Sequence, residues 1–463
     1  MKMTGGRKRR QAELAVDFTE GPVFKQMLLF TVPLFLSNLM QIFYNMTDMM
    51  IVGWAEGKSG LAAVSVSGDI TNCLATIMMG FATAVQVIVS HYLGSNQKEK
   101  IGKFLFAAVM FLLVVTALLS GGCLCLREHL LNWMNTPSEI RWEARVYLMI
   151  SAGGLVFICG YNLMSAILRG MGDSKHPFLF VSAASIFNVV LDFLFVMILK
   201  CGAAGAAVAT VISQAVSFFM AAAFLYRNRT GFAITSVDRR IDGNMLKILL
   251  RQGIPLALKS AAVQLTRLFT NSFIYSYGTI VCAASGVTGK LTSVNNMLSE
   301  SLNTSGSSMI SQNIGGKKYE RVLRILWCML LTTLPIAALL SICIICRPDL
   351  IYGIFTNDPE VIEVCYLYIP MGVLAFFSSP IRSAMSALIN GSGNYKVNFI
   401  VAILDAFVIR VGLGLYLGLG RDMGFAGFWL GDAIASYTPC VIGGILLFSG
   451  RWKENKYMLG DKE

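Results

Sequence analysis

The residues with the clearest chemical potential in this sequence are acids inside long apolar runs. Asp48, Asp69 and Asp192 each occur in a run long enough to cross a bilayer, where an ionisable side chain is costly and marks a functional site by default. Away from their ends, the apolar runs of the first half contain no basic residue that could neutralise them. We therefore expect carboxylates here to bind a small cation.

Polar neighbours occur at helical spacing around two of these acids. In the first run the intervals are three, four and three residues, which places four side chains on one helical face: Asn38, Gln41, Asn45 and Asp48. Tyr44 lies one turn before Asp48, and Asn188 lies one turn before Asp192. Oxygen ligands suit Na⁺, whereas a buried carboxyl beside a like charge favours its protonated form, so both H⁺ and Na⁺ stay open. Two acids hydrogen-bonded for packing are the alternative.

Pro33 lies fifteen residues before Asp48 in the same run. A proline inside a helix removes a backbone hydrogen bond and bends the helix. The bend is either static or able to change as Asp48 changes its charge.

The composition identifies the elements that must position these residues. Of the 463 residues 55% are hydrophobic and 14% charged, with a mean hydropathy of +0.64, which excludes an ordinary soluble domain and indicates an all-α integral membrane protein. Twelve runs are predicted to span the membrane: 27–53, 61–93, 101–126, 143–169, 177–199, 203–226, 245–277, 280–314, 321–346, 361–389, 397–419 and 424–449.

The net charge of +12 reflects membrane topology. With both termini in the cytoplasm, cytoplasmic segments hold 26 of the 38 Lys and Arg residues and the opposite loops hold seven. A nucleic-acid surface is therefore not needed to explain the excess.

The chain repeats itself at an offset of about 221–222 residues, as Pro33 and Pro255 illustrate. Each copy holds six helices, so we expect two six-helix lobes related by a pseudo-twofold axis along the membrane normal, with a substrate path between them. The predicted parts are an N-terminal tail (1–20), an N-lobe (21–226), a cytoplasmic linker (227–243), a C-lobe (244–450) and a C-terminal tail (451–463).

The second half has the opposite charge bias inside its apolar runs. Away from the ends of these runs, three acids, Glu300, Asp405 and Asp432, occur with five cations: Lys259, Arg267, Lys290, Arg382 and Arg410. A run as polar as 280–314 cannot face lipid all round, so it should line a hydrated cavity. The predicted substrate-cavity residues are Asn38, Gln41, Asn45, Gln264, Arg267, Asn296, Glu300 and Arg382.

The repeat also suggests an ion pair. At an offset of 222, Asn188 corresponds to Arg410 and Thr210 to Asp432. We expect Arg410 and Asp432 to pair across the last hairpin, so that a fixed guanidinium fills the second lobe's counterpart of the cation site.

Several motifs resemble those of the multidrug and toxic compound extrusion (MATE) family, over roughly residues 20–450. They are Pro33…Tyr44…Asp48, the Leu168-RGMGDSK turn, Asn188-VVLD192 and the GAAGAAVAT block that ends at Thr210. The resemblance implies a cation-coupling site at Tyr44, Asp48, Asn188, Asp192 and Thr210, with Asp48 and Asp192 as metal ligands if the ion is Na⁺. The acids that some members place in the second lobe are missing, because Gln264 and Ser378-Ser-Pro380 stand there.

These observations predict an antiporter that exports small organic molecules in exchange for H⁺ or Na⁺ by alternating access. We expect a monomer in the plasma or inner membrane with both termini cytoplasmic, no cofactor beyond the coupling ion, no nucleic-acid partner and no enzymatic activity. A lipid-linked saccharide flippase, or an exporter of anionic or zwitterionic metabolites with the related fold, is the alternative.

Overall fold

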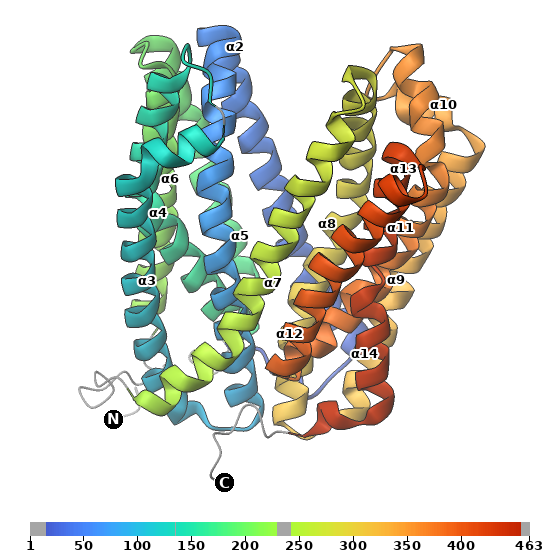
Figure 1. Cartoon of the computed structure of the whole chain (residues 1–463). Helices are drawn as coiled ribbons and strands as arrows, with labels where there is room; N and C mark the ends of the chain where they lie inside the picture. The colour runs from blue at the N-terminus through green and yellow to red at the C-terminus, as the bar shows by residue number, and fades with distance from the viewer. Residues whose placement is uncertain (1–14, 135, 229–241, 455–463) are drawn as a thin grey trace. The chain divides into compact units, whose positions relative to one another are not determined.

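The computed structural model describes residues 15–134, 136–228 and 242–454, and every regular element in them is a helix (Figure 1). The first half contains α2 (Val23–Gly94), α3 (Lys98–Trp133), α4 (Arg141–Gly170), α5 (Lys175–Asp192), the π-helix η1 (Phe193–Ile198) and α6 (Gly202–Arg227). The second half contains α7 (Gly243–Tyr275), α8 (Thr279–Gly315), α9 (Tyr319–Cys346), α10 (Pro348–Gly353), α11 (Pro359–Gly391), α12 (Tyr395–Ile403), the π-helices η4 (Leu404–Leu413) and η5 (Tyr416–Gly420), α13 (Gly424–Ala435), α14 (Thr438–Ser449) and the 3₁₀ turn η6 (Arg451–Lys453).

The predicted twelve spans are confirmed. Nine helical segments of the described chain are long and apolar enough to cross a membrane. One of them, α2, has 72 residues and is interrupted at Gly57 (φ 63°, ψ −142°), so it supplies two spans. The remaining two are α7 and α8, which have 33 and 37 residues but are more polar than the others.

The chain forms two compact units. Two of the three borders between them, at 31/32 and 253/254, fall inside helices, whereas the border at 17/18 precedes α2. In the described part, unit 1 consists of residues 15–17 and 32–253, and unit 2 of residues 18–31 and 254–454. The two borders inside helices lie next to Pro33 in α2 and Pro255 in α7, two prolines at equivalent positions of the repeat. The expected lobes, 21–226 and 244–450, differ from these units because the first turns of α2 and α7 each pack with the other half's helices. Most of the predicted tails and linker lies outside the described residues.

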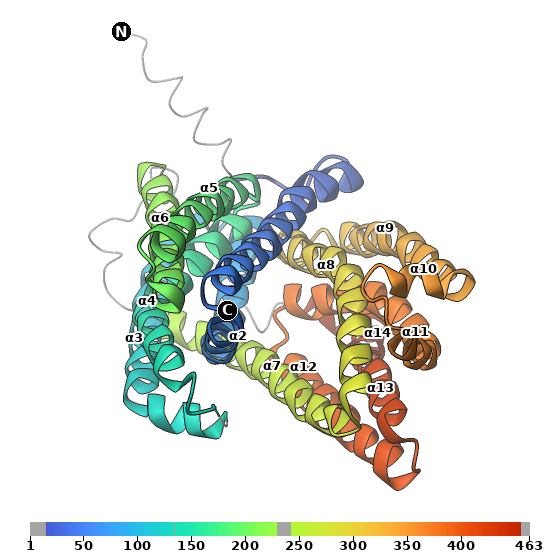
Figure 2. The same cartoon turned by 90° about the horizontal axis from the view of Figure 1, so that it is seen from above.

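Unit 1 is held together by close helix packing around α4. This helix packs against α3 and α6, and α6 packs against α5 (Figures 1 and 2). A Cβ atom at Gly154 would lie 2.2 Å from Cγ2 of Val211, and one at Gly160 would lie 2.8 Å from the Phe218 ring. The absence of a side chain at these positions therefore lets α6 approach the α4 backbone, which is how membrane helices commonly associate.

Unit 2 is built around α8 and α11. These two helices pack against each other and against α9, and α11 also contacts α13 and α14. At Gly391 a Cβ atom would lie 2.9 Å from the backbone oxygen of Ser307, so α11 and α8 nearly touch. Residues that precede the border in α2 complete the hydrophobic core beside α8 and α11: Phe18, Val23, Met27 and Phe30.

The π-helices mark a difference between the two copies. η5 begins 222 residues after Leu194 and ends 222 residues after Ile198, so it is the counterpart of η1. η4 has no such counterpart, because the equivalent residues of the first copy belong to α5. The fifth span of the second copy is therefore π-helical over a longer stretch than the fifth span of the first copy. π-Helical turns often occur at functional positions.

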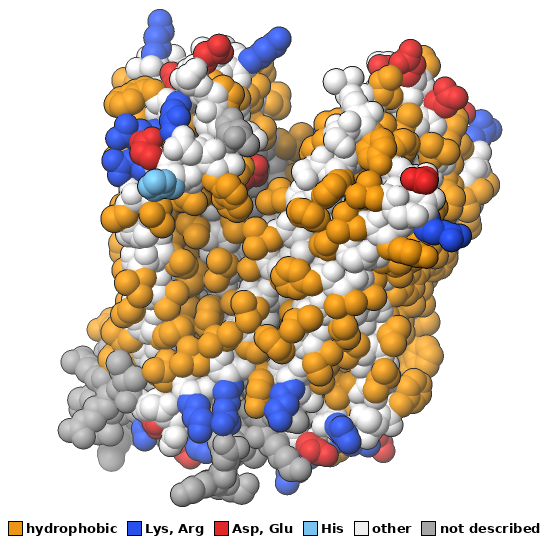
Figure 3. All heavy atoms as spheres, in the orientation of Figure 1, with side chains coloured by type: hydrophobic (Ala, Val, Ile, Leu, Met, Phe, Trp, Pro, Cys, Tyr) orange, Lys and Arg blue, Asp and Glu red, His pale blue; other side chains and the backbone are white. Residues whose placement is uncertain are grey.

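The surface of each unit fits a lipid environment. In the face that Figure 3 shows, hydrophobic side chains cover the middle of each unit, while Lys, Arg, Asp and Glu gather near its ends. Large apolar side chains such as Leu118 and Phe448 are 70% and 90% exposed. A soluble protein would not leave this much apolar surface in water, so the chain is a multi-pass membrane protein.

Candidate functional site

The side chains on the polar face of α2 differ in burial, and Asp48 is the most deeply buried of them. Asn38, Gln41 and Tyr44 are half-buried and Asn45 is exposed, whereas Asp48 is only 6% exposed. The predicted face therefore places Asp48 at its buried end.

Asp48 and Asp192 form a pair of buried acids. Asp192, the last residue of α5, is 0% exposed, and the two carboxylates lie close enough for their charges to interact. Within the described residues, Oδ1 of Asp48 and both carboxylate oxygens of Asp192 accept no hydrogen bond. Buried polar atoms in proteins are almost always satisfied, so this pair has free capacity for a cation. Asp69, the third acid of the first half, is exposed and takes no part in the pair.

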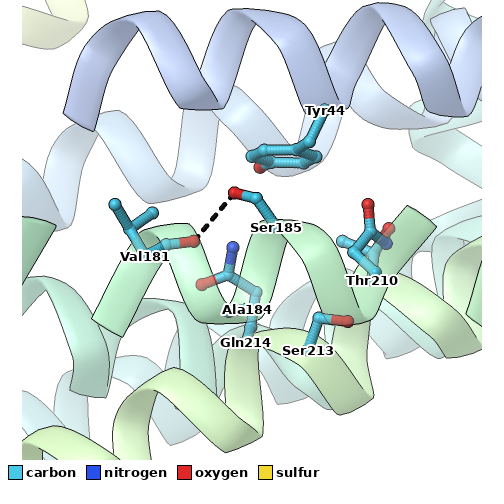
Figure 4. Close-up of a pocket in the computed structure, with 8 residues that line it drawn as sticks. Tyr44, Val181, Ala184, Ser185, Thr210, Ser213 and Gln214 are labelled. Atoms are coloured by element: carbon cyan, nitrogen blue, oxygen red, sulfur yellow. Dashed lines mark hydrogen bonds between the residues drawn. The ribbon is translucent and has the colours of Figure 1, made fainter. Parts of the chain in front are cut away.

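A pocket of about 220 Å³, part of it open to solvent, lies one turn away from the pair along the same helices, and neither acid lines it (Figure 4). Its walls come from α2, α5 and α6, and its lining includes Tyr44, Asn188 and Thr210. Both amide atoms of Asn188 and the hydroxyl of Thr210 are buried without a hydrogen-bond partner in the described residues. The structure thus brings together three residues from separate helices that the sequence analysis had placed in one site.

Other polar groups of this site were missed by the sequence analysis. Ser185, Ser213 and Gln214 also line the pocket, and Ser185 Oγ donates to the backbone oxygen of Val181 at 2.8 Å (Figure 4). Tyr147 of α4 is buried beside both acids and Tyr44. Ser185 lies on the same face of α5 as Asn188 and Asp192, so its spacing offered a signal. Ser213, Gln214 and Tyr147 lie on helices without a buried acid, and their spacing gave none.

Unit 2 holds a buried ion cluster at Arg410. This side chain is 0% exposed, and its guanidinium contacts both Asp432 of α13 and Asp405 of η4, the latter at 2.9 Å. The contact to Asp432 was expected, and the contact to Asp405 was not. Residues i and i+5 lie about 140° apart on an α-helix, but the wider π-helical turn of η4 brings them to the same side.

The remaining predicted cavity residues of unit 2 differ in burial. Gln264, Arg267 and Asn296 are half-buried, and Glu300 is exposed. Arg382 is half-buried and donates from Nη2 to Oδ1 of Asn296 at 3.1 Å. This oxygen also accepts from Ser379 Oγ at 2.7 Å, so polar side chains link α8 to α11.

A protein-family model, MatE, matches the chain twice, over residues 33–194 and 255–416. The two matches are offset by 222 residues, the same interval that relates the two prolines. Each match begins within two residues of a unit border, at 31/32 or at 253/254.

Known proteins resemble most of the chain. The probable multidrug resistance protein YpnP of Bacillus subtilis is 30% identical over 66% of this chain and 69% of its own length. The probable multidrug resistance protein NorM of Thermotoga maritima is 21% identical over 95% of each chain. Among solved structures, a MOP-superfamily transporter from Pyrococcus furiosus, described as having a binding pocket of reverse polarity, aligns with a TM-score of 0.85 at 21% identity and covers 98% of this chain and 100% of its own.

An outward-facing multidrug resistance MATE transporter of the MOP superfamily aligns with a TM-score of 0.84 at 21% identity, over 98% of this chain and 99% of that one. At these identities the solved structures establish the twelve-helix, two-lobe fold. The two family matches cover more than half of the sequence and establish the family. This chain belongs to the MatE family and is a multi-pass membrane transporter, not an enzyme.

Proposed function

We propose that this protein is a secondary active exporter of small organic molecules, driven by the inward movement of H⁺ or Na⁺ through unit 1. Relatives named for multidrug resistance support the class of cargo. The distribution of Lys and Arg supports a plasma-membrane protein with both termini in the cytoplasm.

The observation that carries this proposal is the pair Asp48 and Asp192, buried together with oxygens that accept no hydrogen bond in the described chain. Two adjacent negative charges without a counter-ion are unfavourable in a low-dielectric environment. Binding of one cation relieves this repulsion, so the free energy of unit 1 depends on whether the site is filled. Through this dependence, an ion gradient can shift the conformational equilibrium of the protein.

The same residues can accommodate either ion. For Na⁺, the carboxylates, Oδ1 of Asn188 and Oγ1 of Thr210 would supply hard oxygen ligands. For H⁺, one carboxyl would carry the proton and the neighbouring amide and hydroxyl would hydrogen-bond to it. In both cases the bound ion neutralises Asp48 on α2.

Neutralisation of Asp48 is proposed to change the curvature of α2 at Pro33, on the border between the two units. A ligand can shift a conformational equilibrium only if it binds the two states unequally. The ion meets this requirement if the Asp48–Asp192 distance differs between the inward- and outward-open states. Half-buried or exposed polar residues are proposed to contact the cargo: Asn38, Gln41 and Asn45 in unit 1, and Gln264, Asn296 and Glu300 in unit 2.

Transport by the purified protein in proteoliposomes tests the proposal. A pH gradient or a Na⁺ gradient is imposed separately, and the movement of cationic, zwitterionic and anionic organic compounds is measured. Asp48→Asn is expected to abolish gradient-driven export while the protein still folds and inserts. Asp69→Asn, which changes an exposed acid of the same helix, should export normally. Wild-type export by Asp48→Asn would overturn the proposal.

A further inference from the structure

Three half-buried cations on α7 and α11 of unit 2 have no acid partner within the described residues. Lys259 and Arg267 lie two turns apart on α7, and Arg382 lies on α11; all three are half-buried. None of them makes an ion pair within 4.0 Å of a described acid. A cation inside a membrane span is normally paired, so this cluster requires an explanation.

The three side chains form one electrostatic cluster. The charge of Arg382 interacts with those of Lys259 and Arg267, although the three belong to two different helices. Like charges that share a partly buried region raise the free energy of the protein, and the protein here does not separate them. Asn296 holds Arg382 in place through its side-chain oxygen.

The acids nearby do not neutralise this cluster. Asp405 and Glu300 are within electrostatic range of Lys259 and Arg382. Asp405, however, already accepts a hydrogen bond from Arg410 at 2.9 Å. Glu300 is exposed and accepts from Asn303 Nδ2 at 3.2 Å. Positive charge therefore remains in excess around Lys259, Arg267 and Arg382.

Arg410 illustrates what a structural cation looks like in this unit. It is fully buried and contacts two acids. Lys259, Arg267 and Arg382 differ in both respects, because they keep access to open space and lack an acid. This contrast favours a ligand-binding role over a packing role.

We propose that Lys259, Arg267 and Arg382 form a subsite that binds a carboxylate or sulfonate group on an apolar organic molecule. A guanidinium binds such a group through two parallel hydrogen bonds, and the ammonium of a lysine adds a third donor. The apolar part of the ligand suits Val263, a half-buried side chain that lies one turn from both Lys259 and Arg267 on the same face of α7. The inference deepens the proposed function, on which it rests for the idea of an organic cargo, by assigning that cargo an anionic group.

Binding of two dyes of similar size and opposite charge tests the subsite. The full chain in lipid nanodiscs is titrated into 6-carboxyfluorescein, which carries carboxylates, and separately into rhodamine 123, which is a cation, and fluorescence anisotropy gives each Kd. The wild-type protein is expected to bind 6-carboxyfluorescein more tightly. Lys259→Gln and Arg267→Gln should each weaken this binding by about tenfold or more, the effect of losing a charge-assisted hydrogen bond.

Matched variants keep the result interpretable. Lys290→Gln removes an exposed cation of α8 in the same unit and should leave the affinity unchanged. Arg382→Lys keeps the charge but loses the bidentate geometry and should bind more weakly than the wild type, whereas Arg382→Gln should bind more weakly still. Size-exclusion profiles and Tm values identify any variant that fails to fold. The affinities of the variants that do fold then decide whether the subsite exists.

The outcomes separate this inference from the proposed function. Asp48→Asn should bind 6-carboxyfluorescein like the wild type, because binding does not need the coupling ion site, although it no longer exports. Tighter binding of rhodamine 123 than of 6-carboxyfluorescein, binding of neither dye by the folded protein, or wild-type affinity in Lys259→Gln and Arg267→Gln would each overturn the subsite. None of these results would affect the coupling role of Asp48 and Asp192.

Discussion

Arg410 and Asp405 lie five residues apart on one π-helical segment, and Nη2 of Arg410 donates to Oδ1 of Asp405 at 2.9 Å. Because Arg410 also contacts Asp432 of α13, one buried guanidinium joins two neighbouring elements of unit 2. The cluster therefore ties the irregular winding of η4 to the packing of the last span.

Removal of the guanidinium should destabilise unit 2 strongly. Arg410→Ala leaves two acids next to each other in a buried region, and breaking a buried ion pair in this way costs about 3–5 kcal/mol. We expect a large decrease in the Tm of the purified protein. The triple variant Arg410→Met, Asp405→Leu and Asp432→Leu should recover much of this loss, because no charge is then left unpaired. An unchanged Tm in Arg410→Ala would contradict the structural role of the cluster.

The two acids of unit 1 should behave as one functional group. Asp48→Asn, Asp192→Asn and the double variant are expected to show the same loss of gradient-driven export. When two residues bind one ion together, the effects of their substitutions on export do not add up. Initial export rates in proteoliposomes measure the effect, and Asp69→Asn serves as the control. Losses that multiply in the double variant would indicate two independent sites.

The contact between α4 and α6 predicts that alanine substitutions at two adjacent glycines differ in their effect on stability. Gly154→Ala places a methyl group against Val211 and should lower the free energy of unfolding by about 1–3 kcal/mol, as overpacking usually does. Gly153→Ala meets no atom within 4 Å and should be nearly neutral. Thermal unfolding in detergent measures both, and Val211→Ala should rescue Gly154→Ala. Equal Tm values for the two glycine variants would show that the helices are not in close contact.

Arg321 should fix the chain that leads into α2. Its guanidinium donates to the backbone oxygens of Phe18 at 2.9 Å, Glu20 at 3.1 Å and Gly21 at 2.8 Å. Arg321→Ala should destabilise this segment by about 1.5–3 kcal/mol, the usual contribution of hydrogen bonds to a charged group. Hydrogen–deuterium exchange of residues 18–31 is expected to accelerate, and it should stay unchanged in Arg324→Ala, which alters an exposed arginine of the same helix. Equal exchange in both variants would refute this anchoring.

The sequence was sufficient for the features that depend on local pattern. Twelve spans follow from run length and hydropathy, and the duplication follows from the offset between motifs. Spacing on a single helix also placed Tyr44 and Asp48 together, as well as Asn188 and Asp192. The association of Thr210 with them required the family resemblance, because α6 carries no acid that would mark it.

Features that depend on irregular winding or on distant packing could not be predicted. Asp405 is out of register with Arg410 on a regular helix, so only the π-helical turn reveals their contact. Tyr147 reaches the acids from α4, a helix that carries none of the motifs around Asp48 and Asp192. The unit borders at residues 31/32 and 253/254 arise from tertiary packing, although the two prolines beside them were visible in the sequence.

The position of these borders has a consequence for biosynthesis. Residues 18–31 are synthesised before residues 32–253 of unit 1, yet Phe18, Met27 and Phe30 complete the core of unit 2 with side chains from α8, α9 and α11. Unit 1 in turn needs residues up to Gly253, and Tyr92 donates to Met245 Sδ at 3.5 Å. A ribosome that has finished α6 has therefore produced neither unit in complete form. The first turns of α2 must wait in the membrane or at its surface until α11 has emerged, and a nascent chain cut at the linker would yield two halves that each lack part of a core.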